Sequence, residues 1–185
     1  MLNLAELSEL IDERHTFDLL RVQTLDRYDV ASDGDDFRRY LADEAEPTAS
    51  RKGPWLEHLR ALVDSGRAWR NVHALSTPLS DYLRYACEWG YAYNVRAGQD
   101  VRIVEPDAGL MAELIAVGDF WVIDRKLVVR MQYDAGGRFV GAESLSDDGR
   151  GPLFRAVAGL LWRQAEPFTS WWARHPQYHR TTGAA

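Results

Sequence analysis

The sequence predicts an α/β or α+β fold in which helices pack on a mixed β-sheet. Helix-like and strand-like hydrophobic patterns alternate between residues 3 and 104. Residues 120–145 then contain three strand-like stretches, separated by a polar turn and a glycine-rich turn. We therefore expect a β-α-β unit followed by an antiparallel meander towards the C-terminus.

The N-terminal part is predicted to contain helices around one strand. Residues 3–15 have the apolar spacing of an amphipathic helix, and residues 16–28 alternate as a strand with one buried face. Capping residues at the start of 32–44 predict a short helix that runs through Leu41. A polar loop over 45–53 should lead into a helix over 54–66, which a glycine ends.

The middle of the chain predicts the β-α-β unit. Strands are expected over 67–76 and 100–106, with a helix entered at 77–80 and ending near Gly90. The crossover should be right-handed, so this helix packs on one face of the sheet. The segment 75–94 holds four tyrosines, one tryptophan and the only cysteine of the chain.

The C-terminal part is predicted to close the fold with helices. Residues 152–175 favour one helix, an interruption near Pro167 and a shorter helix. Residues 181–185 should form a frayed tail. With no repeat or linker, we expect the whole of 1–185 to form one domain.

Composition narrows the class of protein. Charged residues make up 27% and hydrophobic residues 46% of the chain, with a net charge of −6. A net negative charge disfavours a direct nucleic-acid binder. No apolar run is long enough to span a membrane, and the acidic N-terminus lacks a secretory pattern. We expect a cytoplasmic protein that does not enter the membrane.

No familiar catalytic or metal-binding motif is present. The sequence lacks HExxH, GxSxG, P-loop and GxGxxG patterns, so no catalytic residue, metal ligand or cofactor is predicted. Cys87 and His73 are expected to be packing and hydrogen-bonding residues. His175 and His179 flank a proline and are interpreted as part of a solvated tail.

Two aspartates mark the ends of a short apolar strand. Asp119 and Asp124 are five residues apart, which is roughly 16 Å along a strand. That distance is too long for a shared acid–base or Mg²⁺ site unless the strand bends. We interpret both as turn formers, and keep them with His73 as the alternative of an enzyme with an unfamiliar site.

The aromatic helix is the best candidate for a binding site. Aromatic side chains at helical spacing are typical of a core, but buried tyrosine hydroxyls need partners and often line a cleft. The candidate ligand-binding residues are Tyr82, Tyr85, Trp89, Asn94, Asp119 and Arg130.

Four segments carry a resemblance to a known family. "TLDRYDV", "PWLEHLRALVDSGRAWRNVHALSTPLSDYLRYACEW", "NVRAGQDVRIVE" and "GDFWVIDRKLVVRMQYDAGGRFVGAESL" together resemble an uncharacterised actinobacterial domain family. Its members are often encoded near helix-turn-helix regulators of the Xre type, which implies a regulatory context. A weaker likeness, to half of a phospholipase-D-type domain, lacks that superfamily's HxK motif and so implies a non-catalytic relative.

These observations favour a non-catalytic regulatory or interaction protein that binds a protein partner or a small ligand. A helix-turn-helix regulator is the partner that the resemblance implies, and self-association stays open. The first alternative is an enzyme acting on a small molecule or nucleic acid. A third is a DNA-binding accessory protein that uses the arginines between residues 150 and 180.

Overall fold

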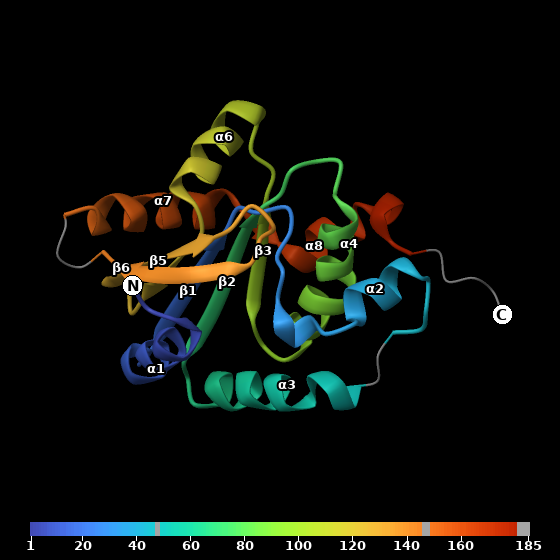
Figure 1. The fold of residues 1–185 in the computed structure, drawn as a ribbon, viewed down its shortest axis with the longest axis horizontal. Helices are drawn as coiled ribbons and strands as arrows, with labels where there is room; N and C mark the ends of the chain where they lie inside the picture. Colours follow the sequence, from blue (N-terminus) through green and yellow to red (C-terminus); the bar gives the residue numbers. More distant parts are fainter. Residues whose placement is uncertain (47–48, 146–148, 181–185) are drawn as a thin grey trace.

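The fold is a mixed sheet with helices on both faces (Figure 1). The computed structural model describes residues 1–46, 49–145 and 149–180, without the side chains of residues 32 and 49–51. Within these residues the sheet has seven strands in the order β6-β5-β4-β1-β2-β3-β7. The predicted α/β fold is confirmed, whereas the frayed tail at 181–185 lies outside the described residues.

The strands combine parallel and antiparallel pairing. They are β1 (Asp18–Gln23), β2 (Ala68–Ala74), β3 (Asp100–Val104), β4 (Phe120–Ile123), β5 (Leu127–Tyr133), β6 (Phe139–Ser144) and β7 (Glu166–Pro167). β1, β2 and β3 are parallel, and β4 pairs antiparallel with β1. β4, β5 and β6 form the expected meander. The two-residue β7 on the edge of β3 was not predicted.

Helices and short helical turns connect the strands. They are α1 (Leu4–Arg14), η1 (Ala31–Asp33), α2 (Asp36–Leu41), α3 (Ala49–Asp64), α4 (Asp81–Tyr85), the π-helical η2 (Ala86–Tyr91), α5 (Ala92–Arg96), α6 (Ala108–Val117), α7 (Gly151–Gln164), α8 (Phe168–Ala173) and η3 (Pro176–Tyr178). None of the described helices combines the length and apolar composition that crossing a bilayer requires.

Local capping explains where two of the helices begin. The Asn3 side chain accepts from the Glu6 backbone N–H, and the Glu6 carboxylate accepts from the Asn3 N–H, which forms a capping box at α1. Asp107 accepts from the Leu110 N–H in the same way and starts α6. The sequence reading left α6 unassigned, because its apolar residues lack a clear one-sided stripe.

The two faces of the sheet have different surroundings. On the face that we call the α7 face, Val22, Val72 and Phe120 pack with Phe154 and Leu161 of α7. On the opposite face, the α1 face, Leu19 and Trp121 pack under α1, and α3 lies on the same side (Figure 1). β1 was expected to have one buried face. Both of its faces are largely buried, because strands flank it on each side and helices cover both faces.

Two predicted helix boundaries are wrong. α3 begins at Ala49 instead of Pro54, because the fixed φ of proline is helical and only one backbone hydrogen bond is lost. The aromatic helix does not end near Gly90 but continues through η2 to Arg96. A π-helical segment keeps the backbone hydrogen-bonded past the glycine, so Gly90 does not act as a stop.

Candidate functional site

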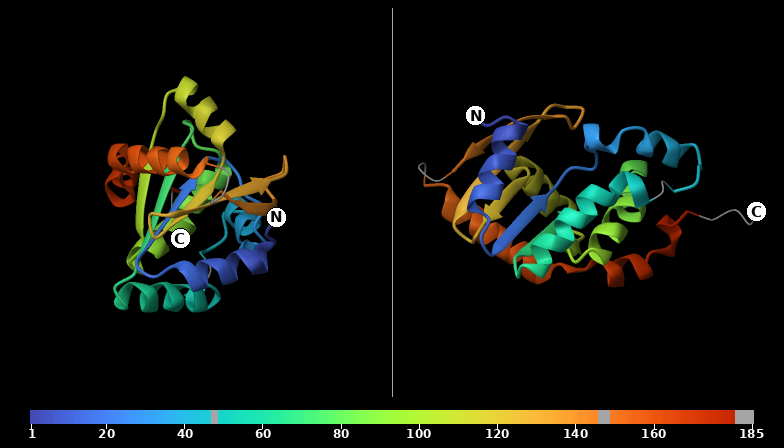
Figure 2. Two further views of the ribbon diagram at one scale, coloured as in Figure 1. Left: turned by 90° about the vertical axis from the view of Figure 1, so that its left-hand side faces the viewer. Right: turned by 90° about the horizontal axis from the view of Figure 1, so that it is seen from below.

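Arg21 occupies the middle of the α1 face. β1 alternates so that Leu19 and Arg21 point to the same side, and the register places Asn71 of β2 and Trp121 of β4 directly beside Arg21. Seen from below, β1 runs between α1 and α3 (Figure 2, right). The fold therefore places a charged side chain on a sheet face where apolar side chains such as Leu19 and Trp121 adjoin the buried polar Asn71.

Aromatic rings surround the Arg21 guanidinium. Its Cζ lies 5.3 Å from the ring centre of Trp121 and 5.6 Å from that of Tyr28, both within cation–π range. Its Nη2 donates to the Tyr133 hydroxyl at 3.2 Å. Burial opposes the charge, but the oxygens of Tyr133 and Tyr28 and the Asp119 carboxylate raise the pKa of Arg21 above its ordinary value. Arg21 is therefore a permanent cation.

Asp119 is the nearest carboxylate to this cation. Its Oδ2 lies 3.9 Å from Nη2 of Arg21, beyond hydrogen-bond length. Oδ1 accepts from the backbone N–H and the hydroxyl of Thr24 at 2.8 and 3.0 Å, and Oδ2 accepts from the Tyr28 hydroxyl at 2.7 Å. Burial raises the pKa of Asp119, although Arg21, Tyr28 and Thr24 act in the opposite direction.

Asp119 is therefore a buried acceptor, and its predicted role as a turn former is wrong. The strand-end position alone could not distinguish these roles, because the donors come from Thr24 and Tyr28, far away in the sequence. Asp124 does fit the prediction. It has a positive φ of 49°, and its carboxylate accepts from the backbone N–H groups of Thr16, Phe17 and Asp18.

Two polar atoms at this place lack a partner among the described residues. Nε of Arg21 is buried and has no hydrogen-bond acceptor, and Oδ1 of Asn71 is buried and has no donor. Unpaired buried polar atoms are rare in proteins because each costs free energy. The Arg21 side chain is nevertheless 26% exposed, so part of the guanidinium reaches the surface.

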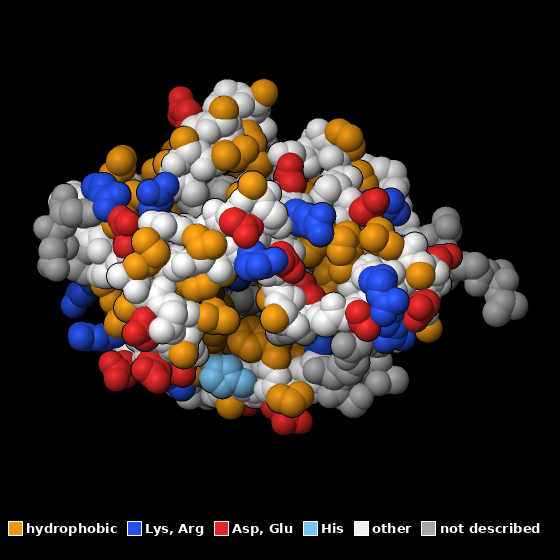
Figure 3. Space-filling model, viewed as in Figure 1, with side chains coloured by type: hydrophobic (Ala, Val, Ile, Leu, Met, Phe, Trp, Pro, Cys, Tyr) orange, Lys and Arg blue, Asp and Glu red, His pale blue; other side chains and the backbone are white. Residues whose placement is uncertain are grey.

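A row of tryptophans extends from Arg21 towards α3. The ring centres of Trp121 and Trp69 are 6.0 Å apart, and those of Trp69 and Trp55 are 5.2 Å apart, with near-perpendicular planes in both pairs. Trp55 is 39% exposed. Figure 3 shows hydrophobic side chains gathered in a hollow of the surface between α1 and α3. By their mutual contacts we define Arg21 with Trp55, Trp69, Trp121 and Tyr133 as one site, the Arg21 hollow.

Further polar groups are buried beside the hollow. The Nδ1 atom of His73 lies 2.6 Å from the Tyr91 hydroxyl, and Nε2 lies 3.0 Å from the Leu25 carbonyl oxygen. Tyr91 also donates to Gln23 at 3.1 Å. Burial lowers the pKa of His73 to about 3, so the ring is neutral near pH 7. The prediction of a hydrogen-bonded His73 agrees with this arrangement, in which the ring is fully buried.

Three of the predicted site residues lie together in the core. Tyr82, Tyr85 and Trp89 are 8%, 4% and 2% exposed and pack with Tyr28 and Tyr40. Tyrosine hydroxyls of this cluster have partners, since Tyr82 donates to Asp33 and Tyr40 to Glu88. Tyr82 packs against the Tyr28 ring, which in turn contacts Arg21.

The other predicted site residues are spread over the molecule. Asp119 lies behind Arg21, and Asn94 accepts from the Trp55 indole at 3.0 Å, so both border the Arg21 hollow. Arg130 lies elsewhere. Its guanidinium donates to the carbonyl oxygens of Val117 and Ala116 at the end of α6. The structure therefore does not bring Arg130 together with the aromatic helix.

Sequence reasoning missed Arg21, Trp55, Trp69 and Trp121. One signal was available, because Arg21 interrupts an apolar strand on the face that it shares with Leu19. The proximity of the tryptophans was not available, because they lie on three separate elements, α3, β2 and β4.

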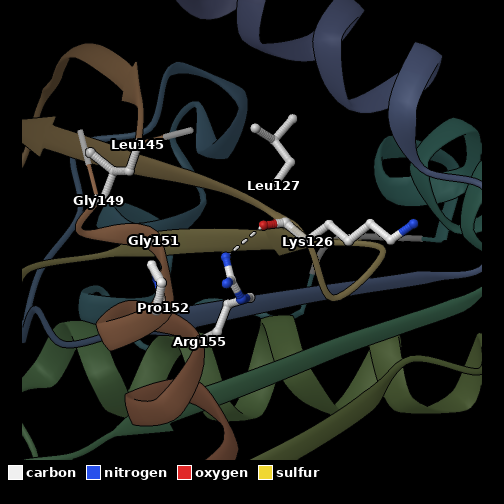
Figure 4. A pocket seen from close by; sticks show the side chains of 7 residues that line it. All are labelled: Lys126, Leu127, Leu145, Gly149, Gly151, Pro152 and Arg155. Carbon is white, nitrogen blue, oxygen red and sulfur yellow. Dashed lines mark hydrogen bonds between the residues drawn. The ribbon is translucent and has the colours of Figure 1, made fainter. Parts of the chain in front are cut away.

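A shallow pocket of about 420 Å³ lies at the start of α7 (Figure 4). In the close-up the Arg155 side chain turns towards the backbone of Lys126, whose carbonyl oxygen it contacts at 3.0 Å, while the Lys126 amine extends away. Its lining residues Leu145 and Gly149 are separated in the sequence by residues 146–148, which are outside the described part of the chain. No group of three metal-binding side chains occurs among the residues that the structure describes.

The histidines near the C-terminus are ordered on tryptophans. The ring of His175 stacks on Trp171 and that of His179 on Trp172, each at 4.3 Å between ring centres. Each histidine ring also contacts a backbone carbonyl oxygen of the tryptophan that it covers. Their interpretation as a solvated tail is wrong, because the imidazoles pack on the buried Trp171 ring and the partly buried Trp172 ring of α8.

Comparison with known proteins places most of the chain in one family. Residues 5–173 match the family model described as "Domain of unknown function (DUF6879)". No curated protein matches the chain.

Proposed function

The chain belongs to the DUF6879 family, and we propose that it is a non-catalytic regulatory module that binds a small anionic ligand in the Arg21 hollow. The observation that carries this proposal is the state of the Arg21 guanidinium. It is a permanent cation among aromatic rings, its Nε has no acceptor among the described residues, and the nearest carboxylate is 3.9 Å away.

The free-energy cost of an unpaired guanidinium donor favours the binding of an anion from outside the protein. A buried donor without an acceptor loses the hydrogen bonds that it makes to water, which costs about 1–3 kcal/mol. Asp119 offsets this only in part, because Thr24 and Tyr28 already donate to its oxygens. A ligand anion that accepts from the exposed part of the guanidinium would balance the charge of this cation beside aromatic rings, where charged hydrogen bonds are strong.

The groups considered for an enzyme are engaged in structural contacts. His73 uses both ring nitrogens, and Asp124 accepts three backbone N–H groups. Asp119 is 1% exposed, so a substrate could not touch its carboxylate without displacing Tyr28. These contacts favour binding over catalysis by those residues.

A regulatory role also requires a partner that responds to ligand binding. We propose a helix-turn-helix regulator of the Xre type as this partner, on the basis of the family resemblance, and the cytoplasm as the compartment. Co-purification of the two proteins, with and without a bound ligand, would test this part. Equal recovery of the regulator in both conditions would contradict ligand-dependent regulation.

The binding proposal is tested with anilinonaphthalene sulfonate (ANS), a fluorescent aromatic monoanion. We expect ANS to bind wild-type protein at a single saturable site. Arg21→Gln should weaken binding by about tenfold or more, the loss expected for a charged hydrogen bond. The matched control Arg130→Gln removes a partly buried arginine from the α7 face and should leave ANS binding unchanged.

Folding must be checked in both variants, because ANS also binds partly unfolded chains. Near-ultraviolet circular dichroism and a cooperative melting transition provide this check. Equal ANS affinity in wild-type and folded Arg21→Gln protein would contradict the proposal.

A further inference from the structure

We infer that the ligand of the Arg21 hollow is a planar aromatic monocarboxylate. This inference rests on the proposed function, and it adds the chemical class of the ligand. It follows from three properties of the described residues: the charge available in the hollow, the arrangement of the rings and the geometry of the guanidinium.

The charge available matches a monoanion. Arg21 is the permanent cation that the described contacts place on the rings of Trp121 and Tyr28. His15 contacts the Trp69 ring, but burial lowers its pKa, so it adds no positive charge near pH 7. Asp119, 3.9 Å behind the guanidinium, repels a second negative charge. A phosphate dianion would meet one cation and one carboxylate, which is a poor electrostatic match.

The arrangement of the rings matches a flat apolar body. Trp121 and Trp69 meet at 79° between their planes, and Trp69 and Trp55 meet at 89°. Trp121 is buried, so the partly exposed rings of Trp69 and Trp55 are the ones with which a planar aromatic ligand can pair. An aliphatic chain would gain only the burial of its apolar area. The partial exposure of Trp55 leaves this end of the row open to an incoming ring.

The guanidinium geometry matches a carboxylate. Nη2 is oriented by its hydrogen bond to the Tyr133 hydroxyl, and Nη1 has no acceptor among the described residues. A planar carboxylate can accept two parallel hydrogen bonds from a guanidinium edge. The Trp121 ring beside the guanidinium then lies close to the aromatic ring that bears the carboxylate.

The test is displacement of ANS from wild-type protein by a set of matched compounds. The set contains naphthoate, the neutral naphthamide, cyclohexanecarboxylate, naphthyl phosphate and a short acidic peptide. We expect naphthoate to displace ANS at a concentration about tenfold or more below any of the others. Because the experiment uses wild-type protein, it does not depend on whether a variant folds.

Each other outcome overturns the inference in a defined way. Equal displacement by naphthamide would show that the charge is not recognised, and equal displacement by cyclohexanecarboxylate would show that the ring is not. Stronger displacement by naphthyl phosphate or by the peptide would assign the hollow to that class. If ANS binds through Arg21 and none of the compounds displaces it, the ligand class is wrong and the proposed function stands. If ANS binding does not depend on Arg21, the proposed function itself fails.

The Arg21→Lys variant tests whether the planar guanidinium recognises the ligand carboxylate, independently of any loss of folding. Arg21→Lys keeps the positive charge facing Asp119 but removes the planar fork. We expect Arg21→Lys to lose the preference for naphthoate over naphthyl phosphate while the protein keeps a cooperative melting transition. An unchanged preference in folded Arg21→Lys protein would contradict the carboxylate geometry.

Discussion

The Asp119 carboxylate faces the Arg21 guanidinium at 3.9 Å, yet its hydrogen bonds come from Thr24 and Tyr28. The pair is thus close enough for electrostatic attraction and too far apart for a hydrogen bond. Asp119 is fixed by the protein, whereas Arg21 keeps donor capacity. The buried Asp119 therefore fixes a negative charge behind Arg21, while the guanidinium can still donate hydrogen bonds on the side of the hollow.

Removal of the Asp119 carboxylate should strongly destabilise the protein. Asp119→Ala leaves the donors of Thr24 and Tyr28 unpaired and Arg21 without a counter-charge, and we expect a loss of about 3–5 kcal/mol in the free energy of unfolding. Urea denaturation measures the free energy of unfolding of the variant and of wild type. Glu113→Ala, on the exposed side of α6, is the control and should change stability by no more than about 0.5 kcal/mol. A loss below about 1 kcal/mol for Asp119→Ala would contradict the buried-acceptor role.

His73 should make the protein sensitive to acid. Its folded pKa of about 3 lies below the ordinary value of 6.5, so the unfolded chain takes up a proton that the folded chain excludes. This contribution to stability is complete above pH 6.5 and is lost as the pH falls towards 3, by about 1.4 kcal/mol for each pH unit.

The His73 contribution can be isolated by comparing pH profiles of the unfolding free energy. Asp119 acts in the opposite direction, because its raised pKa favours the folded state as the pH falls. The comparison is therefore wild type against His73→Gln, which should have a shallower decline below pH 6.5. His58→Gln, at an exposed position, is the control. Parallel profiles for wild type and His73→Gln would refute a buried neutral histidine.

Alanine variants of Trp89 and Trp55 should show which tryptophan belongs to the core and which to the Arg21 hollow. Trp89 is 2% exposed, so Trp89→Ala should cost about 3–5 kcal/mol of stability through the cavity that it creates. Trp55 is 39% exposed, so Trp55→Ala should cost much less and should weaken ANS binding. Thermal melting and ANS titration of both variants measure the two effects. Wild-type ANS affinity in Trp55→Ala would remove Trp55 from the hollow.

Two glycines should respond in opposite directions to alanine. Gly137 has a φ of +83°, and an added Cβ would lie 2.5 Å from the Arg27 carbonyl oxygen, so Gly137→Ala should destabilise the protein by more than about 1 kcal/mol. Gly53 lies in α3, where an added Cβ meets nothing within 4 Å. Gly53→Ala should stabilise by about 0.5–1 kcal/mol. Chemical denaturation measures both variants, and a Gly137→Ala protein as stable as wild type would contradict the turn geometry at Gly137.

Periodicity and turn residues were sufficient to predict most of the architecture. The alternation around Arg21 and the spacing around Trp89 located β1 and the aromatic helix, and the turn before Gly137 located the β5–β6 hairpin. These signals are local in sequence, so they can be recognised without any knowledge of the tertiary fold. The helix α6 was not predicted, because a largely apolar segment has little hydrophobic periodicity.

The candidate site could not be predicted in the same way. The hollow joins Trp55, Trp69 and Trp121 through contacts between distant segments, and the partners of Asp119 are Thr24 and Tyr28. The sheet order β4-β1-β2 places Trp121 and Trp69 on the strands beside β1, and the packing of α3 adds Trp55. The aromatic helix attracted attention because its rings are close in sequence, although they fill a core.

The most direct test of the central claim is the side-chain nitrogen spectrum of isotope-labelled arginine in wild-type protein, recorded during titration with naphthoate. The Nε–H signal of Arg21 is assigned by its absence from the Arg21→Lys spectrum. We predict that this signal shifts in a saturable way because the ligand carboxylate accepts from the same guanidinium, while the Arg130 signal stays unchanged. An Arg21 signal that does not move at saturating naphthoate, or that moves no more than that of Arg130, would contradict the account.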